Sequence, residues 1–142
     1  MSAQDNVTAA RRLLEEGFGE GDLSVVDELV ADDFIEHQNG VQGIGPDAVK
    51  QIIIGLRESL SELRFNVEAV VAGGDTVWLR SRATARNTRP FMGWPPTGRE
   101  VEIDVIDVYR FSAGKVVEHW GVADRLGLLE QLGLVDADRR VA

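Results

Sequence analysis

The sequence predicts a single α+β domain in which helices come first and a run of antiparallel strands follows. Apolar residues recur at helical spacing through the first part of the chain, and from about residue 62 they alternate with polar ones. The chain has 142 residues, shows no internal repeat or linker, and is long enough to enclose a core. A curved sheet wrapped around helices would leave a hollow suited to a ligand.

Two helices are predicted before residue 32. The first runs from about Asp5 to Phe18 and ends at Gly19 and Gly21, since glycine commonly terminates helices. Ser24 is expected to cap the second helix, with Asp27 as a weak capping-box partner. Their apolar faces comprise Val7, Ala10, Leu13, Leu14 and Phe18 in the first helix and Val25, Val26, Leu29 and Val30 in the second.

A short extended piece and a third helix complete the first half. The extended piece covers residues 33–37, and Gly43, Gly45 and Pro46 then interrupt the chain. Pro46 suits the first turn of a helix. The apolar face of this third helix consists of Ala48, Val49, Ile52, Ile53, Leu56 and Leu60.

The second half predicts four strands and a terminal helix. Residues 65–71 alternate in the manner of a strand, and Gly73-Gly74-Asp75 predicts a hairpin turn. Four leucines between residues 126 and 132, followed by Gly133, predict a short helix before a polar tail. Between the hairpin turn and this terminal helix we expect a strand over residues 76–86, a Gly/Pro-rich loop over 90–98, a strand over 99–111, a turn at 113–114 and a strand over 115–124.

Composition excludes several classes of protein. Acidic residues outnumber basic ones by 24 to 15, so a nucleic-acid-binding face is not expected. Cysteine is absent, which excludes disulfides, a thiol nucleophile and a Cys-ligated metal. The sequence shows neither an apolar signal core nor a run long enough to span a membrane, and we expect a soluble cytoplasmic protein.

Two aspartates on neighbouring strands are the main candidates for chemistry. Asp124 ends the last strand, and the period of two places Trp120, Val122 and Asp124 on one face. A carboxylate desolvated by an indole and a valine would suit acid/base catalysis. The alternative is structural, because aspartate is a preferred N-cap and a helix begins near Arg125.

Asp107 is the second candidate. It shares an otherwise apolar strand face with Tyr109, where a carboxylate needs either a partner or a function. The structural alternative is a salt bridge across the sheet to Arg80 or Arg82. Asp104 falls on the opposite face, which we expect to be solvated or to face a second subunit.

The chain has only two histidines, and their positions differ. His37 ends the short extended piece, where it could shuttle a proton inside the hollow or simply bond to the backbone. His119 alternates away from Trp120 and Asp124, so we expect it to be structural. Their separation does not match a helical metal-binding motif, and no metal site is predicted.

Aromatic and cationic side chains provide candidate contacts to a substrate. Phe91 and Trp94 lie in the Gly/Pro-rich loop and could form a lid. Arg80 and Arg82 could bind a carbonyl or carboxylate, unless they pair with Asp107 or face solvent. The expected substrate-binding residues are therefore Trp120, Trp94, Phe91, Arg80, Arg82 and Tyr109.

Several segments together resemble the SnoaL-like polyketide cyclases, an ester cyclase family within the superfamily that shares the cone-shaped fold of nuclear transport factor two. The resemblance covers about residues 6–134 and rests on GDLSVVDELVADDFIEH, GPDAVK, PFMGWPPTGREVEI, DVYRF, GKVVEHWGVAD and LGLLEQLG. It implies a cone-shaped α+β domain, frequent homodimers, and no metal or organic cofactor. Founding members close a ring by an intramolecular aldol reaction of polyketide-derived esters.

The resemblance also assigns roles to residues. It implies that Asp124 is the acid/base, with a titratable partner, often histidine, on the neighbouring strand at the position of Asp107. The sequence thus predicts a cofactor-free enzyme that acts on a small apolar carbonyl compound, with Asp124 transferring the proton. His37, Asp107 and an arginine would orient the base and stabilise the enolate.

Two other functions remain open at this level. One is a non-catalytic protein that binds a small molecule. The other is epoxide hydrolysis, which in a sister family uses an arginine between two aspartates, whereas residues 80–84 contain no aspartate. A homodimer is expected to form through the sheet face away from the hollow, because Val101, Ile106 and Val108 give their strand excess apolar surface.

Overall fold

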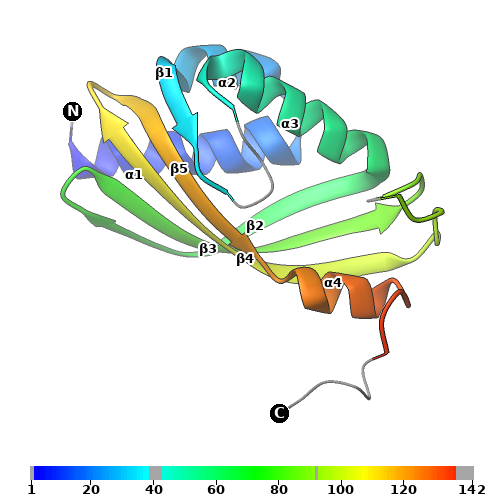
Figure 1. The fold of residues 1–142 in the computed structure, drawn as a ribbon. Helices are drawn as coiled ribbons and strands as arrows, with labels where there is room; N and C mark the ends of the chain where they lie inside the picture. Colours follow the sequence, from blue (N-terminus) through cyan, green and yellow to red (C-terminus); the bar gives the residue numbers. More distant parts are fainter. Residues whose placement is uncertain (1, 39–42, 92, 137–142) are drawn as a thin grey trace.

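The computed structural model describes residues 2–38, 43–91 and 93–136, which form a curved five-stranded sheet with the helices that precede residue 60 packed on one face (Figure 1). The strand order is β1-β5-β4-β3-β2. The helices are α1 (Ala3–Arg12), the π-helix η1 (Leu13–Gly19), α2 (Leu23–Leu29), α3 (Gly45–Ser59) and α4 (Arg125–Gln131). The strands are β1 (Val30–Glu36), β2 (Leu60–Gly73), β3 (Thr76–Asn87), β4 (Glu100–Ser112) and β5 (Lys115–Ala123).

The α+β class predicted from the sequence is confirmed, but the sheet is not wholly antiparallel. Strands β2 to β5 pair antiparallel, whereas β1 pairs parallel with β5 at the edge of the sheet. The extended piece expected at residues 33–37 is the second half of β1, which begins at Val30. Val30 and Phe34 are buried on one face of this strand, so tertiary packing extends it beyond the length that local sequence suggested.

Capping residues define the helix starts differently from the sequence prediction. Ser2 and Asp5 form a capping box at the start of α1, which continues into η1. The cap of α2 is Asp22 rather than Ser24, because the Asp22 carboxylate accepts a hydrogen bond from the Ser24 backbone N–H at 3.0 Å. Asp27 therefore has no role in capping α2 and instead pairs with Lys50 of α3.

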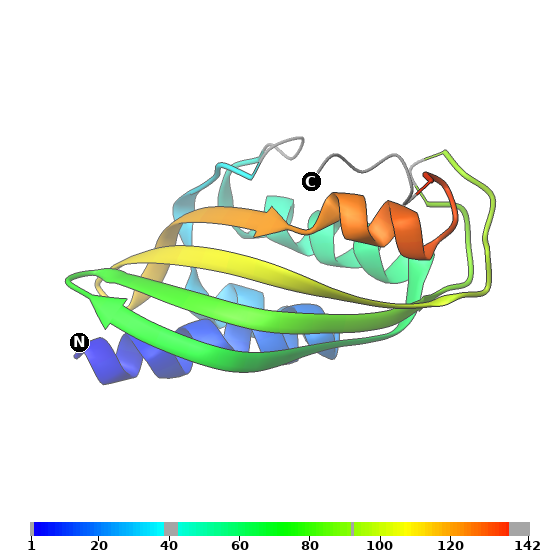
Figure 2. The ribbon, with the colours of Figure 1, turned by 90° about the horizontal axis from the view of Figure 1, so that it is seen from below.

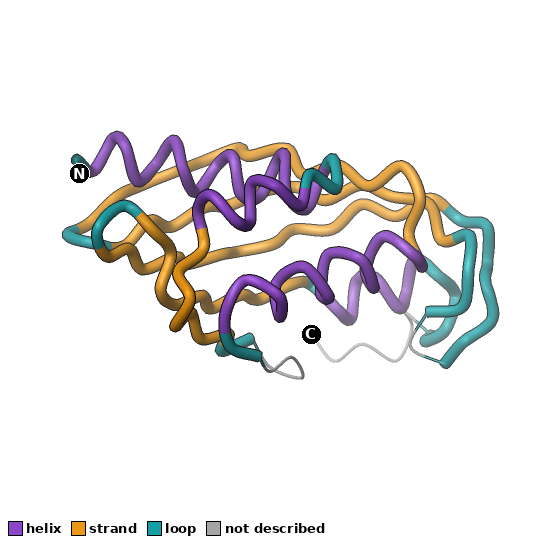
Figure 3. The backbone as a smooth tube through the Cα atoms, turned by 90° about the horizontal axis from the view of Figure 1, so that it is seen from above, coloured by secondary structure: helices purple, strands orange, loops and turns teal. Residues whose placement is uncertain are grey.

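The core lies between the sheet and the helices (Figure 3). Its main cluster joins α1, η1, α2 and α3 to β1, β3, β4 and β5, and includes Leu13, Phe34, Ile53, Leu79 and Phe111. A smaller cluster at the other end of the sheet joins α4 to β2, β3 and β4, and includes Leu60, Leu63, Val101, Leu128 and Leu132. Helix α4 lies beyond the end of β5 (Figure 2).

The sheet has an inner face towards α1–α3 and an outer face away from them, and alternation assigns each strand residue to one of the two. On β4, Asp107 and Tyr109 are buried on the inner face, while Ile106 is exposed on the outer face. On β5, His119 is buried on the inner face and Trp120 is exposed on the outer face. This assignment determines which polar groups can meet inside the domain.

Within the described residues, no helix combines the length and the apolar character needed to cross a bilayer. The cytoplasmic location expected from the sequence stays a prediction.

Candidate functional site

A buried chain of ionisable groups joins three strands on the inner face. The His119 ring lies between two carboxylates, with Nδ1 2.7 Å from Glu36 Oε1 and Nε2 2.7 Å from Asp107 Oδ1. Each of the three residues is less than a tenth exposed. Tyr109 stacks on the imidazole, with the ring centroids 4.7 Å apart. This array of Glu36, His119 and Asp107 is the candidate active site.

Strand pairing places these residues together. The parallel ladder sets Glu36 of β1 beside His119 of β5, and the antiparallel ladder sets Asp107 of β4 beside Gly121 of β5. Tyr109 is the direct cross-strand neighbour of His119. The site therefore depends on the long connection that brings the N-terminal strand β1 alongside the C-terminal strand β5.

The sequence contains two Glu-His dipeptides, and the structure pairs each glutamate with the other histidine. On the inner face, Glu36 contacts His119. On the outer side, Glu118 Oε2 lies 2.7 Å from His37 Nε2. Because neighbouring residues in a strand point to opposite faces, the register that forms the inner pair also forms the outer one.

The imidazole of His119 is held in its charged form. Burial alone disfavours a cation and lowers its pKa, but the hydrogen bonds to Asp107 and Glu36, together with their charges, outweigh that effect and raise the pKa to about 9. At neutral pH both ring nitrogens therefore donate, one to each carboxylate. Burial, followed by the charges of Asp107 and Glu36, raises the pKa of Tyr109 well above its ordinary value.

Two polar atoms of the inner face remain unpaired among the residues that the structure describes. Asp107 Oδ2 is buried without a hydrogen-bond partner, and so is Ser81 Oγ on the adjoining strand β3. Ser81 pairs with Val105, one inner-face position along β4 from Asp107. A buried carboxylate oxygen without a donor costs free energy, and a ligand or water that supplied a donor would remove that cost.

The array offers no metal-binding cluster. Across residues 2–38, 43–91 and 93–136, no three His, Asp or Glu side chains converge in a way that could hold a metal ion.

The structure confirms that Asp107 faces inward with Tyr109, but it gives Asp107 a different partner from the expected arginines. Arg80 and Arg82 lie on the outer face, where Arg80 pairs with Glu68 and Arg82 pairs with Glu102 and Asp104. They reach neither the array nor the core. Their alternation with buried Leu79 and Ser81 fixes this outward direction.

Trp120 and His37 also differ in location from the prediction. We expected both in the hollow, yet His37 stacks flat on Trp120 on the outer side, with ring centroids 4.9 Å apart and planes at 11°. Glu118, which binds both His37 and Arg110, has a pKa below its ordinary value, chiefly because of the Arg110 hydrogen bond and then that of His37. Trp120 was expected inside because aromatic residues usually line the core, whereas the strand register places its neighbour His119 there.

Asp124 occupies the structural position that the sequence analysis left open as an alternative. Its carboxylate accepts a hydrogen bond from the Gly127 backbone N–H at 2.9 Å and caps α4. Gly127 has no side chain at the point where the Asp124 carboxylate lies, so the cap fits closely. Asp124 is exposed. The desolvation expected from Trp120 and Val122 is therefore not present.

The two loop aromatics lie outside the array. Phe91 and Trp94 pair through their backbones, with Phe91 packed against the smaller core cluster and Trp94 about half exposed. Of the residues predicted to contact a substrate, only Tyr109 touches the array.

Sequence reasoning missed His119 and Glu36. The available signal was the pair of Glu-His dipeptides at residues 36–37 and 118–119, each at or near the end of an extended segment. The two dipeptides indicate a site only if the two segments are known to pair in parallel, and the local sequence does not predict that pairing.

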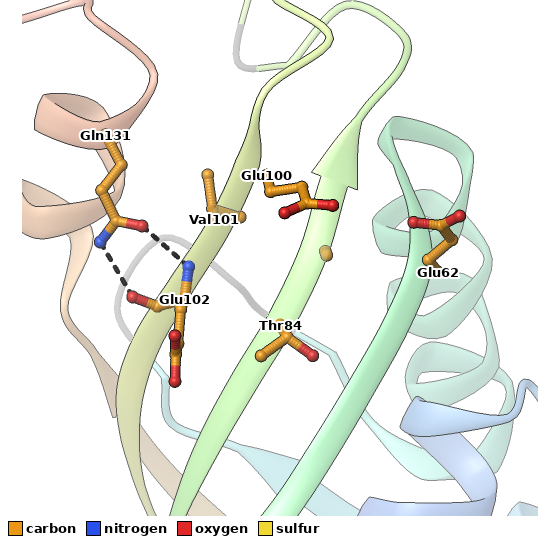
Figure 4. A pocket seen from close by; sticks show the side chains of 7 residues that line it. Glu62, Thr84, Glu100, Val101, Glu102 and Gln131 are labelled. Carbon is orange, nitrogen blue, oxygen red and sulfur yellow. Dashed lines mark hydrogen bonds between the residues drawn. The ribbon is translucent and has the colours of Figure 1, made fainter.

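Two hollows lie on the outer face. One, of about 400 Å³, is lined by residues that include Glu62, Glu100 and Glu102, and by Gln131, whose side chain makes two hydrogen bonds to the Glu102 backbone (Figure 4). Its carboxylates are paired with Arg82 and Arg86. The other is an apolar groove of about 510 Å³, lined by Thr76, Trp78, Ile106, Val108, Trp120 and Val122. Neither hollow reaches the array.

Comparison with known proteins identifies the family. The model of the SnoaL-like polyketide cyclases matches residues 8–132, so the chain belongs to this family. Nogalonic acid methyl ester cyclase of Streptomyces nogalater is 28% identical over 120 residues, which are 82% of this chain and 89% of that protein.

Solved structures show the same fold. TsrD of Streptomyces laurentii superimposes with a TM-score of 0.86 at 23% identity, covering 95% of this chain and 99% of that one. IdmH of Streptomyces antibioticus has a TM-score of 0.78 at 29% identity, covering 94% of this chain and 99% of that one. The cone-shaped fold and the family that the sequence resembled are thus confirmed.

The charge of His119 predicts a specific pH dependence of stability. In the unfolded chain His119 has its ordinary pKa of 6.5, and in the folded protein the pKa is about 9. Its contribution is therefore complete below pH 6.5 and is lost as the pH rises through about 9. A shift of this size corresponds to on the order of 3 kcal/mol of unfolding free energy. Urea unfolding across this pH range measures it.

The matched variants are His119→Gln and His37→Gln. The first should remove the loss of stability between these two pH values, because glutamine does not titrate. The second alters the exposed histidine of the outer pair and should keep it. An unchanged pH profile in His119→Gln would show that another group causes the dependence.

Proposed function

We propose that this protein is a cofactor-free cyclase that closes a ring in a small apolar carbonyl compound by proton transfer, with Asp107 as the proton-transfer residue. The family supports cyclase-type chemistry. The observation that carries the assignment to Asp107 is its unpaired Oδ2, a buried carboxylate oxygen without a donor among the described residues.

Each member of the array has a role in this proposal. His119 donates to Asp107 Oδ1, fixing the carboxylate and leaving Oδ2 to accept a proton from the carbon next to a carbonyl group. Glu36 accepts from the other side of the ring and fixes its orientation. Tyr109 packs against the imidazole and helps to exclude water. Asp124, the base implied by the resemblance, acts as a helix cap in this scheme.

Two alternatives make different demands on the site. A non-catalytic binding protein would bind the same carbonyl compound without depending on the ionised Asp107. Epoxide hydrolysis would place an arginine between acidic residues at the reacting centre. Both arginines of the middle strand instead lie in outer-face ion pairs, which disfavours this chemistry.

Substitution of the two aspartates tests the proposal. With nogalonic acid methyl ester as probe, ring closure and deuterium uptake at the enolisable carbon are followed in D₂O. Asp107→Asn should lower both rates by about 10²- to 10⁴-fold, the usual contribution of general acid–base catalysis. Asp124→Asn should keep them, since asparagine caps helices nearly as well as aspartate.

The reverse pattern, with Asp124→Asn inactive and Asp107→Asn active, would return the proton-transfer role to Asp124. Binding of the probe without ring closure or exchange by the unaltered protein would favour the non-catalytic alternative.

We also propose that two copies of the chain associate through the outer face. The apolar groove exposes Trp78, Ile106, Trp120 and Val122, a concentration of large apolar surface that is unusual for a monomer. The charged part of the same face is neutralised within one chain by its Arg–Glu pairs, so like copies can approach despite a net charge of -9. Val101, expected to add to this surface, is buried in the smaller cluster.

The outer-face variant Ile106→Glu should convert a dimer to a monomer in light scattering at micromolar concentration, because it places a charge at the centre of the groove. Ile54→Glu is the matched control, since Ile54 is equally exposed but lies on α3. A monomeric unaltered protein, or equal behaviour of the two variants, would contradict this interface.

A further inference from the structure

A second chain of ionisable groups lies on the outer side of the sheet, beside the apolar groove. His37 Nε2 lies 2.7 Å from Glu118 Oε2, and the Arg110 guanidinium donates to Glu118 Oε1 at 2.7 Å. Arg110 also pairs with Asp75, in the turn between β2 and β3. We call these four residues the outer ion chain. It connects the end of β1 to β5, β4 and the hairpin turn, on the face opposite to the array.

His37 connects the outer ion chain to the groove. Its ring stacks on the indole of Trp120, which lines the groove, with the two ring planes at 11°. The His37 backbone is fixed, because its N–H donates to the His119 carbonyl at 2.9 Å. The side chain of His37 is 35% exposed. The imidazole is therefore part of the groove's rim and can exchange protons with solvent.

A second copy bound over the groove would also cover this rim. Stable dimers commonly bury about 800 Å² on each partner, so the contact area extends beyond the residues that line the groove. Thr76 of the groove is the direct cross-strand neighbour of Arg110, which places the outer ion chain at its edge. A symmetric interface brings the same residues from both copies. The charge of the outer ion chain therefore enters the association twice.

This charge depends on the protonation of His37. Histidine is the side chain that ordinarily changes charge between pH 5 and 8, and the chain has two of them. His119 stays charged in this range, because its two carboxylate partners raise its pKa to about 9. Glu118 stays ionised, because the hydrogen bonds from Arg110 and then His37 hold its pKa below the ordinary value.

The balance of charges in the outer ion chain follows from its members. With a neutral His37 ring it has two carboxylates and one guanidinium, and so one negative charge in excess. With a protonated ring it is neutral. On β1 itself, the outward positions before His37 are held by Ile35 and the exposed Asp33, so that strand supplies no compensating cation there.

We propose that the outer ion chain makes the association of two copies pH-dependent, with protonation of His37 strengthening the dimer. This inference rests on the outer-face dimer proposed above. A neutral His37 leaves one excess negative charge at the rim of each copy, and these charges repel one another between chains that each carry a net charge of -9. A protonated ring removes both charges. It also holds the Trp120 indole in the groove wall as a cation stacked on an aromatic ring.

The experiment measures the dimer dissociation constant by sedimentation at about pH 5.5 and about pH 7.5, two values on either side of the ordinary histidine transition. For the unaltered protein it should be on the order of tenfold smaller at the lower pH, since repulsion is removed at both rims. In about 1 M salt the difference should largely disappear, because the Debye length falls to about 3 Å. No pH dependence, or tighter association at the higher pH, would overturn the proposal.

Two variants assign the effect to the outer ion chain. His37→Gln does not titrate and should dimerise with the same dissociation constant at both pH values. Glu118→Gln removes the carboxylate that the His37 cation neutralises, and association should no longer tighten as the pH falls. His37→Gln keeps the array, so any indirect effect of array stability on the dimer persists in it. A pH dependence that persists in His37→Gln would show that another group causes it.

Failure of this inference is distinguishable from failure of the proposed dimer. If the unaltered protein dimerises and Ile106→Glu does not, but the dissociation constant is the same at both pH values, the interface stands and the role of His37 is wrong. If the unaltered protein is monomeric at both pH values, both the interface and the role of His37 are wrong.

Discussion

The hydrogen-bonded ion array of Glu36, His119 and Asp107 is the constraint on which the site depends. It connects the first strand of the sheet to two late ones, so it forms only when β1 has paired in parallel with β5. Two buried carboxylates would be costly without a cation between them, and a buried imidazolium would be costly without both carboxylates. Each charge is thus stable only in the presence of the others. The same dependence fixes the register of the edge strand and the orientation of Asp107.

Most of the fold could be predicted because helices, antiparallel strands and hairpin turns each leave a signal in neighbouring residues of the sequence. The change from helical to alternating spacing located α1 to α3 and strands β2 to β5, and Gly74 and Ala113-Gly114 marked the hairpin turns. What local sequence could not predict was the position of β1 in the sheet. Its parallel partner lies far along the chain, and a parallel pairing leaves no turn signal between the strands. The cap at Asp22 was missed because Ser24, two residues later, is an equally good capping residue.

The site was predicted only in part for a related reason. Asp107 and Tyr109 were assigned to the correct face, since a lone acid in an apolar alternation is conspicuous. Trp120 was expected to be interior because aromatic residues are usually buried. Because side chains alternate along a strand, that choice assigned all the residues of β5 to the wrong face. His119 therefore seemed to face away from the hollow, and His37 towards it. In the structure the two positions are reversed: His119 lies inside and pairs with Glu36, and His37 lies outside and pairs with Glu118. Family resemblance named Asp124, whose surroundings here are those of a helix cap.

The protonation state of His119 is the most direct test of this account. Nitrogen-15 NMR of the imidazole ring reports whether one or both ring nitrogens carry a proton. The array requires both to be protonated at neutral pH, with the signals changing only as the pH approaches about 9. A neutral ring at that pH, with one bare nitrogen and a transition near the ordinary value of 6.5, would contradict it, because the two carboxylates would then have no cation between them.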